Sequence, residues 1–461
     1  MRPKRVVVLA LAFFLAACSA EVAAPRPSET PTATPSPTAS PRPTNAADDV
    51  IYLRSIGGGG VANILAIDAR TGATLRTLPD GSPSFDRSTL FGVEQANGDT
   101  ETVVRRLEIG SGRELGSFTL GGTYHAVWAS GGQAALSRDG HRMLLSIFPY
   151  QDNGQWVTGF RVVDPGSGAT VATLDLKGQS TYGFVATSPD GRSLYFNQSG
   201  DGATGMRVFD VPSSTLLPAA VTAGLLKQSG FRAAPVFSPD GRWMFSLDTG
   251  SPSNCASFDG PRCTPRADEQ PYVLALDLVS RRMLTVPLPM EQRSSDFEKY
   301  PLWSVAIAPD GAAVYAVNPA LGVIDEIDAR QMTLRRTSSI TVSRVDDEGV
   351  LAAIGRIFFP VASAKRYVGG GALLSPNGDL IYAAGYKGIA VVKVADLSSS
   401  SVWQTDGEFD ALALSADGER LYAVSNASRR ITIIATRDGT SLGEIKIPAF
   451  AETIIRIDSS R

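Results

Sequence analysis

The chain has 461 residues, and its 43 Lys and Arg against 46 Asp and Glu give a formal net charge of −3, which gives no reason to expect a nucleic acid as partner. Its 45 glycines and 29 prolines are typical of an all-β protein rich in turns. The roughly 410 residues after the N-terminal region are many for one domain unless the domain is built from repeats.

The first predicted element is a lipoprotein signal peptide at residues 1–18. Arg2, Lys4 and Arg5 form its positive end, and an apolar run of 12 residues follows, which is too short to span a bilayer. The run ends in Leu-Ala-Ala-Cys, which resembles a bacterial lipobox, and the resemblance implies that Cys18 is acylated and becomes the first mature residue. The alternative is an ordinary secretory peptide with a chance cysteine.

A lipid on Cys18 would hold the protein on the outer side of a membrane without a spanning helix. Removal of the three cations of the signal peptide takes the formal net charge from −3 to −6. We therefore expect an extracytoplasmic protein, at the cell surface or in the periplasm, that is attached to the membrane through its lipid anchor.

Residues 19–49 are predicted to form a disordered stalk. They carry seven prolines among Thr, Ser and Ala, a composition that favours extended, polyproline-like conformations and cannot bury a core. Fully extended, these 31 residues reach on the order of 95 Å. The stalk would lift the domain off the membrane.

The rest of the chain, residues 50–461, repeats one short phrase. Ser188–Tyr195 reads Ser-Pro-Asp-Gly-Arg-Ser-Leu-Tyr, and it returns as Ser-Pro-Asp-Gly-Arg-Trp-Met-Phe over Ser238–Phe245. A spacing of roughly 40–50 residues between copies indicates a propeller or a solenoid. Shorter copies lie at Ala308–Gly311, Ser375–Gly378, Ser415–Gly418 and, more weakly, Ser137–Gly140.

The phrase has the chemistry of a tight hairpin turn. Pro fixes φ at the first corner, Asp can bond its own backbone, and Gly accepts positive φ. A type I turn followed by Gly in the left-handed region is a standard three-residue hairpin with a bulge. The recurring aspartates are therefore expected to form turns and not to act in catalysis.

Each repeat is predicted to hold four strands, here named a to d. In residues 182–217, strand a is Tyr182–Thr187, strand b is Ser193–Asn197, strand c is Met206–Val211, and strand d begins near Leu216. Strand b recurs eight times, which predicts eight cycles. The copies are Val50–Ser55, Thr89–Glu94, Arg142–Ile147, Ser193–Asn197, Trp243–Asp248, Ala313–Asn318, Leu380–Gly385 and Leu421–Asn426.

The first cycle lacks a strand a of its own, and the last cycle leaves one strand over, Glu452–Asp458. We expect Thr453–Ile457 to supply strand a to the first cycle. The ring then closes and buries its own edges.

The phrase resembles the repeats of the YVTN and WD40-like (PD40) beta-propeller families over nearly all of residues 49–461. The resemblance implies an all-β propeller of four-stranded blades, and it is almost silent on function. Those families are commonly seven-bladed, so seven blades is the alternative to the eight cycles counted. A misread cycle would most readily fall between Asp328 and Gly371, where the spacing is irregular.

Binding is expected on the face that carries the b–c and d–a connections. The a–b and c–d turns share the other face and are short, whereas residues 249–271, 289–300 and 338–368 form long connections around the fifth and sixth cycles. The alternative is that these are tolerated surface insertions. The candidate contact residues in these connections are Phe258, Arg293, Asp296, Tyr300, Arg356 and Arg366.

A shorter connection on the same face, residues 148–156, holds two further candidates. The rings of Tyr150 and Trp156 could stack on a sugar or on a partner side chain, or pack the base of their own loop.

Apart from Cys18, the cysteines are Cys255 and Cys263, which lie in one long connection. In an exported chain two such cysteines most simply form a disulfide. The alternative, a redox-active pair, fits less well because the spacing is not Cys-x-x-Cys.

No catalytic or metal-binding pattern stands out. His125 and His141, the only histidines, belong to no cluster with metal-ligand spacing. A calcium site around residues 346–348 stays open beside the simpler interpretation of a solvated acidic run. We therefore predict no cofactor and no metal.

The sequence favours a monomeric, surface-anchored module that binds an envelope or extracellular protein or glycan. The alternative is an exported propeller enzyme with its site in the central channel, similar to lactonase-like hydrolases or quinoprotein oxidoreductases. Quinoprotein repeats carry Trp after a Thr-Gly turn, but after Thr71 and Gly72 this chain has Arg76.

Overall fold

The computed structural model describes residues 49–57, 62–129, 132–200, 205–218, 221, 233–249, 270–292, 303–340, 371–385 and 387–458. The chain divides into two units, Met1–Arg42 and Pro43–Arg461, and all of these residues belong to the second. None of the helices in this part of the chain has the length and hydropathy needed to cross a bilayer. Cys18 and nearly all of the stalk lie outside the described residues.

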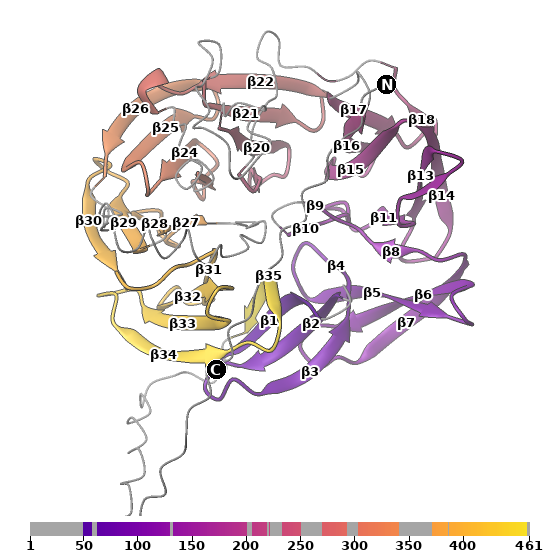
Figure 1. Ribbon diagram of the computed structural model, residues 1–461, viewed down its shortest axis with the longest axis horizontal. Coiled ribbons are helices and arrows are strands. Elements are labelled where there is room, and N and C mark those ends of the chain that lie inside the picture. The colour runs from indigo at the N-terminus through magenta and orange to yellow at the C-terminus, as the bar shows by residue number, and fades with distance from the viewer. Residues whose placement is uncertain are drawn as a thin grey trace, which may run out of the picture. The chain divides into compact units, whose positions relative to one another are not determined.

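Eight antiparallel sheets follow one another around a ring, so the domain is an eight-bladed beta-propeller (Figure 1). In each blade the strands run from a at the centre to d at the rim. Blade 1 consists of β35 (Phe450–Asp458), β1 (Val50–Ile56), β2 (Ala62–Asp68) and β3 (Thr74–Pro79), and blade 2 of β4 (Gly81–Pro83), β5 (Thr89–Ala96), β6 (Glu101–Glu108) and β7 (Glu114–Gly121). Blade 3 consists of β8 (His125–Ala126), β11 (Met143–Ser146), β13 (Gln155–Val163) and β14 (Thr170–Gly178). Blade 4 consists of β15 (Ser180–Thr187), β16 (Ser193–Gly200), β17 (Gly205–Asp210) and β18 (Thr215–Leu216).

The remaining strands complete the ring. Blade 5 consists of β19 (Val236–Phe237), β20 (Trp243–Asp248), β21 (Tyr272–Asp277) and β22 (Arg282–Pro287), and blade 6 of β23 (Ser304–Ile307), β24 (Ala313–Asn318), β25 (Val323–Asp328) and β26 (Thr333–Ser339). Blade 7 consists of β27 (Ala372–Leu374), β28 (Leu380–Gly385), β29 (Gly388–Lys393) and β30 (Ser399–Trp403). Blade 8 consists of β31 (Ala411–Leu414), β32 (Arg420–Ser425), β33 (Arg430–Ala435) and β34 (Ser441–Lys446). Blade 3 gains a further strand, β12 (Tyr150–Asp152), and a separate hairpin is formed by β9 (Trp128–Ala129) and β10 (Gln133–Ala134).

The predicted fold class and the count of eight cycles are confirmed. The predicted bounds of strand b match β20, β24 and β28, and the irregular spacing between Asp328 and Gly371 hides no misread cycle, because β26 completes blade 6 and β27 begins blade 7. The seven-bladed alternative is therefore wrong for this chain.

Ring closure also follows the prediction. β35 pairs antiparallel with β1, from Val50 opposite Asp458 to Ile56 opposite Phe450, so the last strand supplies strand a to the first blade. Asp49, which precedes β1, is fully buried and accepts hydrogen bonds from Arg420 Nε at 2.8 Å and from the Tyr422 hydroxyl, both in blade 8.

Apolar clusters between neighbouring blades form the core. The cluster between blades 8 and 1, for example, contains Ile51, Leu53, Tyr422 and Ile433. The tyrosine of the repeated phrase adds a polar contact, because the Tyr195 hydroxyl of blade 4 donates to the Leu278 carbonyl of blade 5 at 2.9 Å.

Glycines of the repeated turns pack on the turn of the preceding blade. Gly418 has a φ of +73°, and a Cβ added to it would lie 2.5 Å from Cγ of Pro376 in blade 7. Gly140 has nearly the same φ, +76°, but nothing lies within 4 Å of the position of its Cβ.

We therefore expect Gly418→Ala to lower the free energy of unfolding by about 3 kcal/mol, and Gly140→Ala to lower it by only about 1 kcal/mol, because the second change adds backbone strain without a clash. Urea unfolding of both variants measures the difference. Equal losses would show that the contact between turns contributes nothing.

Candidate binding face

On the face formed by the a–b and c–d turns, here called the turn face, the aspartates of the turns bind groups of their own turns. In blade 4, Ser188 Oγ and the backbone N–H of Arg192 donate to Oδ1 of Asp190 at 2.7 and 3.1 Å. In blade 3, the backbone N–H groups of Ser167 and Gly166 donate to Asp164 and hold the pKa of that carboxyl below its ordinary value. Both carboxylates are therefore bound to their own turns.

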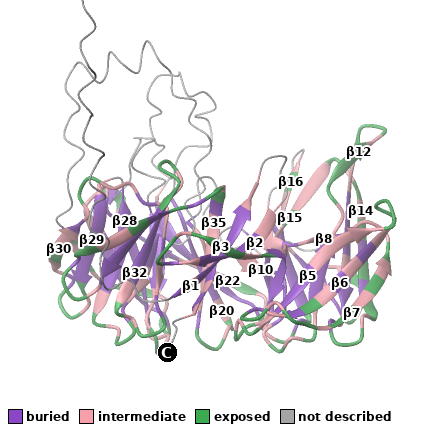
Figure 2. Cartoon of the chain, turned by 90° about the horizontal axis from the view of Figure 1, so that it is seen from below, coloured by how far each residue is buried: buried purple, intermediate pink, exposed green. Residues whose placement is uncertain are grey.

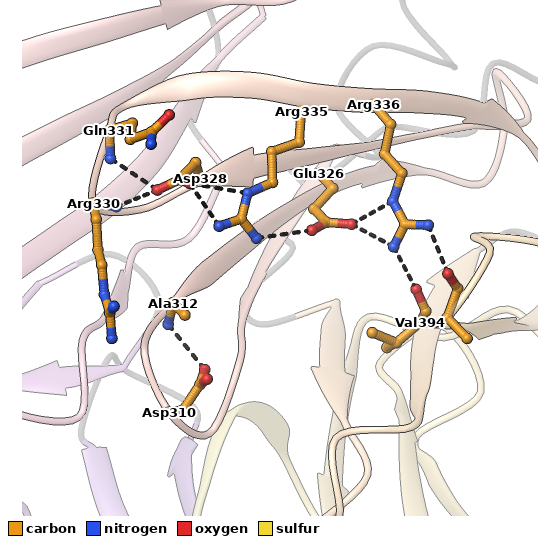
Figure 3. A network of polar contacts seen from close by, with 10 residues as sticks. Asp310, Ala312, Glu326, Asp328, Arg330, Gln331, Arg335, Arg336 and Val394 are labelled. Atoms are coloured by element: carbon orange, nitrogen blue, oxygen red, sulfur yellow. Dashed lines mark hydrogen bonds and ion pairs between the residues drawn. The ribbon is translucent and has the colours of Figure 1, made fainter.

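Ion pairs at the rim of blade 6 connect it to the next blade (Figure 3). Glu326 accepts hydrogen bonds from Arg335 and Arg336, and Arg335 also donates to Asp328 at 2.6 Å. Arg336 donates as well to the carbonyls of Val394 and Ala395 in blade 7, both at 2.7 Å. This charge network therefore links blade 6 to blade 7.

The opposite face, here called the loop face, carries the b–c and d–a connections. The three long connections predicted to bind a partner leave blades 5 and 6 at this face, but their interiors lie outside the described residues. The same holds for the predicted contact residues and for the predicted disulfide. The residues concerned are Phe258, Arg293, Asp296, Tyr300, Arg356, Arg366, Cys255 and Cys263.

On the described part of this face, a hairpin of blade 3 projects beyond the ring, at the upper right of Figure 2. β12 pairs with the start of β13, with Asp152 opposite Gln155, and the turn between them is Asn153-Gly154 with φ of 50° and 73°, as a tight two-residue hairpin requires. Lys177 of β14 donates to Asp152 at 2.6 Å. The hairpin is therefore supported by a third strand.

The hairpin carries exposed aromatic side chains. Tyr150 is 51% exposed, and Phe148, which precedes β12, is 68% exposed. Trp156 is half-buried and neighbours Val157, the residue that pairs with Tyr150. Because side chains alternate along a strand, Tyr150 and Trp156 lie on opposite sides of the hairpin and do not stack on the same face of one ligand.

Phe148 is an aromatic residue that the sequence did not single out. Its ring lies 3.9 Å, centroid to centroid, from the ring of His125 on β8. Burial lowers the pKa of His125, against an opposing effect of Asp80 and Asp99, and so favours the neutral imidazole. Tyr150 follows Phe148 by two residues, and Phe148, Tyr150 and His125 are here together called the aromatic ridge.

Near the centre of the ring, strand a of blade 3 is interrupted. His125 and Ala126 pair with β11, and the chain then leaves the blade as the β9–β10 hairpin, which Figure 1 places toward the centre. Gly132 of this hairpin lies against Thr453 of blade 1, because a Cβ added to the glycine would come within 2.7 Å of that side chain. The hairpin thus connects blade 3 with the closing strand.

The ionic groups beside this hairpin bind one another. Arg54 donates to both oxygens of Asp80 at 2.7 Å and forms an ion pair with Glu452, while its guanidinium lies 4.7 Å from the centre of the Trp128 ring. In the described part of the chain, no three His, Cys, Asp or Glu residues are grouped so that they could hold a metal ion.

No protein-family model matches the sequence, so the resemblance to YVTN and PD40 repeats stays a prediction. No curated protein matches it in sequence either.

Solved structures of beta-propeller proteins resemble the chain. They include Kuenenia stuttgartiensis hydrazine synthase, with 15% identity, 75% of this chain and 96% of that chain covered, and a TM-score of 0.38. The dihydro-heme d1 dehydrogenase NirN is 11% identical, with 89% of this chain and 76% of that chain covered and a TM-score of 0.47. Citrobacter koseri AztD is 10% identical, with 90% of this chain and 99% of that chain covered and a TM-score of 0.47. All three TM-scores are below 0.5. The eight-bladed ring is therefore established by the strand pairing of this chain and not by these likenesses.

Proposed function

We propose that the protein is a lipid-anchored, extracytoplasmic binding module that contacts an envelope protein or glycan through its loop face. The observation that carries this proposal is the aromatic ridge, where Tyr150 on a hairpin held by a third strand and Phe148 just before that hairpin are both exposed. Aromatic side chains that are fixed before binding bury a large area at a small entropic cost.

The point at which the chain enters the ring supports the same face. β1 is a strand b, so it begins at the turn face, where the backbone N–H of Ala69 in a c–d turn donates to the Asp49 carbonyl at 2.9 Å. A tether that joins at Asp49 therefore leaves from the turn face, and the loop face stays clear of the attachment point.

The alternative, an exported hydrolase or oxidoreductase with its site in the central channel, is less favoured. Among the described residues near the centre, the carboxylates of Asp80 and Glu452 are both bound to the guanidinium of Arg54.

The test compares a loop-face variant with a turn-face variant of the soluble domain. Phe148→Ala/Tyr150→Ala removes the aromatic ridge, and Phe85→Ala/Val279→Ala removes two side chains of similar exposure, 59% each, from the turn face. We expect only the loop-face variant to lose co-sedimentation with isolated cell envelopes, by 10-fold or more in affinity, since two aromatic contacts contribute roughly 2 kcal/mol or more.

The source of the ligand is identified by treating the envelopes before binding. Loss after protease treatment indicates a protein, and loss after glycan hydrolysis indicates a glycan. Binding that the loop-face variant retains and the turn-face variant loses would contradict the proposal.

A further inference from the structure

A carboxyl group is buried at the joint between blades 5 and 6. Asp325 lies on β25, the third strand of blade 6, and its side chain is 0% exposed. Ala316, which pairs with it on β24, belongs to the apolar cluster that joins the two blades and that includes Val273 and Val286 of blade 5. An ionised carboxylate is strongly disfavoured in such surroundings unless cations or several donors bind it.

One oxygen of this carboxyl has partners and the other has none. Gln292 Nε2 donates to Oδ1 of Asp325 at 2.9 Å, and Thr337 Oγ1 donates to the same oxygen at 2.6 Å. Oδ2 is buried and, in the part of the chain that the structure describes, accepts no hydrogen bond. The amide oxygen of Gln292, a residue only 4% exposed, is buried without a donor in the same way.

The two unmatched atoms are both acceptors, and they belong to side chains that already bond each other. A single proton on Oδ2 of Asp325 satisfies both atoms at once. The acid O–H then donates to Gln292 Oε1 while Gln292 Nε2–H donates to Asp325 Oδ1, and the two bonds close a ring. A carboxylic acid and a primary amide have the complementary donors and acceptors that such a ring needs.

Burial and a neighbouring carboxylate both favour the protonated form of Asp325. Burial raises its pKa, and the carboxylate of Glu291, in the 3-10 helix η2 (Met290–Gln292), raises it further, against the hydrogen bonds from Thr337 and Gln292. β24 places Ala316 opposite Asp325, and β26 places Thr337 there.

No described cation is paired with Asp325. The two arginines of β26 bind the neighbouring carboxylates instead, Arg335 those of Glu326 and Asp328 and Arg336 that of Glu326. The described side of blade 5 that faces this joint is the apolar cluster.

We propose that folded Asp325 carries a proton on Oδ2, and that the acid forms a cyclic hydrogen-bonded pair with Gln292 that links blade 5 to blade 6. Gln292 ends η2, in the connection that follows β22 of blade 5, so the pair links this connection to the third strand of blade 6. When the proton leaves to solvent, the acid donor is lost and the carboxylate faces an amide oxygen. The joint is then weaker.

The sign of the pH effect follows from the folded pKa lying above the unfolded one. An unfolded Asp loses its proton near pH 4, whereas folded Asp325 retains it. The contribution of the pair to stability is therefore complete below pH 4, and it is lost as the pH rises toward the folded pKa. In that interval, each pH unit raises the unfolding equilibrium constant by up to tenfold.

The test compares the wild type with Asp325→Asn, because asparagine reproduces the protonated acid: its amide N–H replaces the acid O–H. The denaturation midpoints of the two proteins are measured from pH 4 to pH 9. We expect the Asn variant to match the wild type near pH 4 and to exceed it progressively at higher pH. An Asn variant that is less stable throughout, or that fails to fold, would overturn the proposal.

Glu326→Gln is the matched control on the same strand. Glu326 is bound by two arginines, so removal of its charge should lower the midpoint at neutral pH, opposite in sign to Asp325→Asn. Infrared spectroscopy of the wild type adds a reading that needs no variant. One protonated-carboxyl band should persist at a pH where exposed acids are ionised, and its absence would refute the proton.

Discussion

Deletion of β35 should prevent the ring from closing. The truncated chain loses the inner strand of blade 1, which covers Ile51 and Leu53, two residues that are fully buried. It also loses the buried side chains of Ala451, Ile455 and Ile457. Burial of the two isoleucines alone contributes about 4 kcal/mol. We therefore expect the cooperative thermal transition seen by calorimetry to vanish or to shift down sharply.

A synthetic peptide that spans residues 448–461 provides the control. Added in excess, it should restore the transition, and a peptide of the same composition in scrambled order should not. A truncated chain that melts at the temperature of the intact chain would show that β35 is dispensable for closure.

Asp49→Ala should produce the second large effect. The change removes the buried partner of Arg420, whose side chain is 12% exposed and keeps its ion pair with Asp417, and it removes the acceptor of the Tyr422 hydroxyl. Removal of one partner of a buried ion pair commonly costs about 3–5 kcal/mol, because the other charge stays buried. Since Arg420 keeps its contact with Asp417, we expect a loss at the lower end, about 3 kcal/mol. Chemical denaturation at neutral pH measures the loss.

Two milder changes separate the parts of this interaction. Tyr422→Phe removes only the hydroxyl and should cost about 1 kcal/mol. Asp49→Asn keeps the shape and one acceptor, so its cost should lie between the other two. If Asp49→Ala cost no more than Tyr422→Phe, the ion pair would contribute nothing to stability.

The regular parts of the fold could be predicted because their signals are local. A Pro-Asp-Gly turn followed by an apolar strand marks strand b wherever it occurs, and β20, β24 and β28 have the predicted bounds. Closure could be predicted because the first cycle lacked one strand and the last had one to spare, and unpaired edges are unfavourable.

The irregular parts depend on contacts between distant residues. Strand a of blade 3 is split by the β9–β10 hairpin, whose strands have two residues each and carry no turn phrase. The separation of Tyr150 from Trp156 depends on the register of β12 against β13, which the sequence alone left open.

The same limit applied to the buried acid. Asp325 is one of many acidic residues in the sequence, and its amide partner, Gln292, lies 33 residues earlier and in the connection from another blade. No local pattern marks this pair, because only the packing of blade 5 against blade 6 brings the two side chains together.

Closure through β1 and β35 also determines when the ring can form. The two strands are separated by almost the whole domain, and bringing chain ends together across roughly 400 residues costs about 2 kcal/mol more in loop entropy than across roughly 40, the length of one blade. If the chain is exported from its N-terminus, as proposed, β35 emerges last. Until then the edge of β1 is unpaired, and an unpaired strand edge is prone to aggregation.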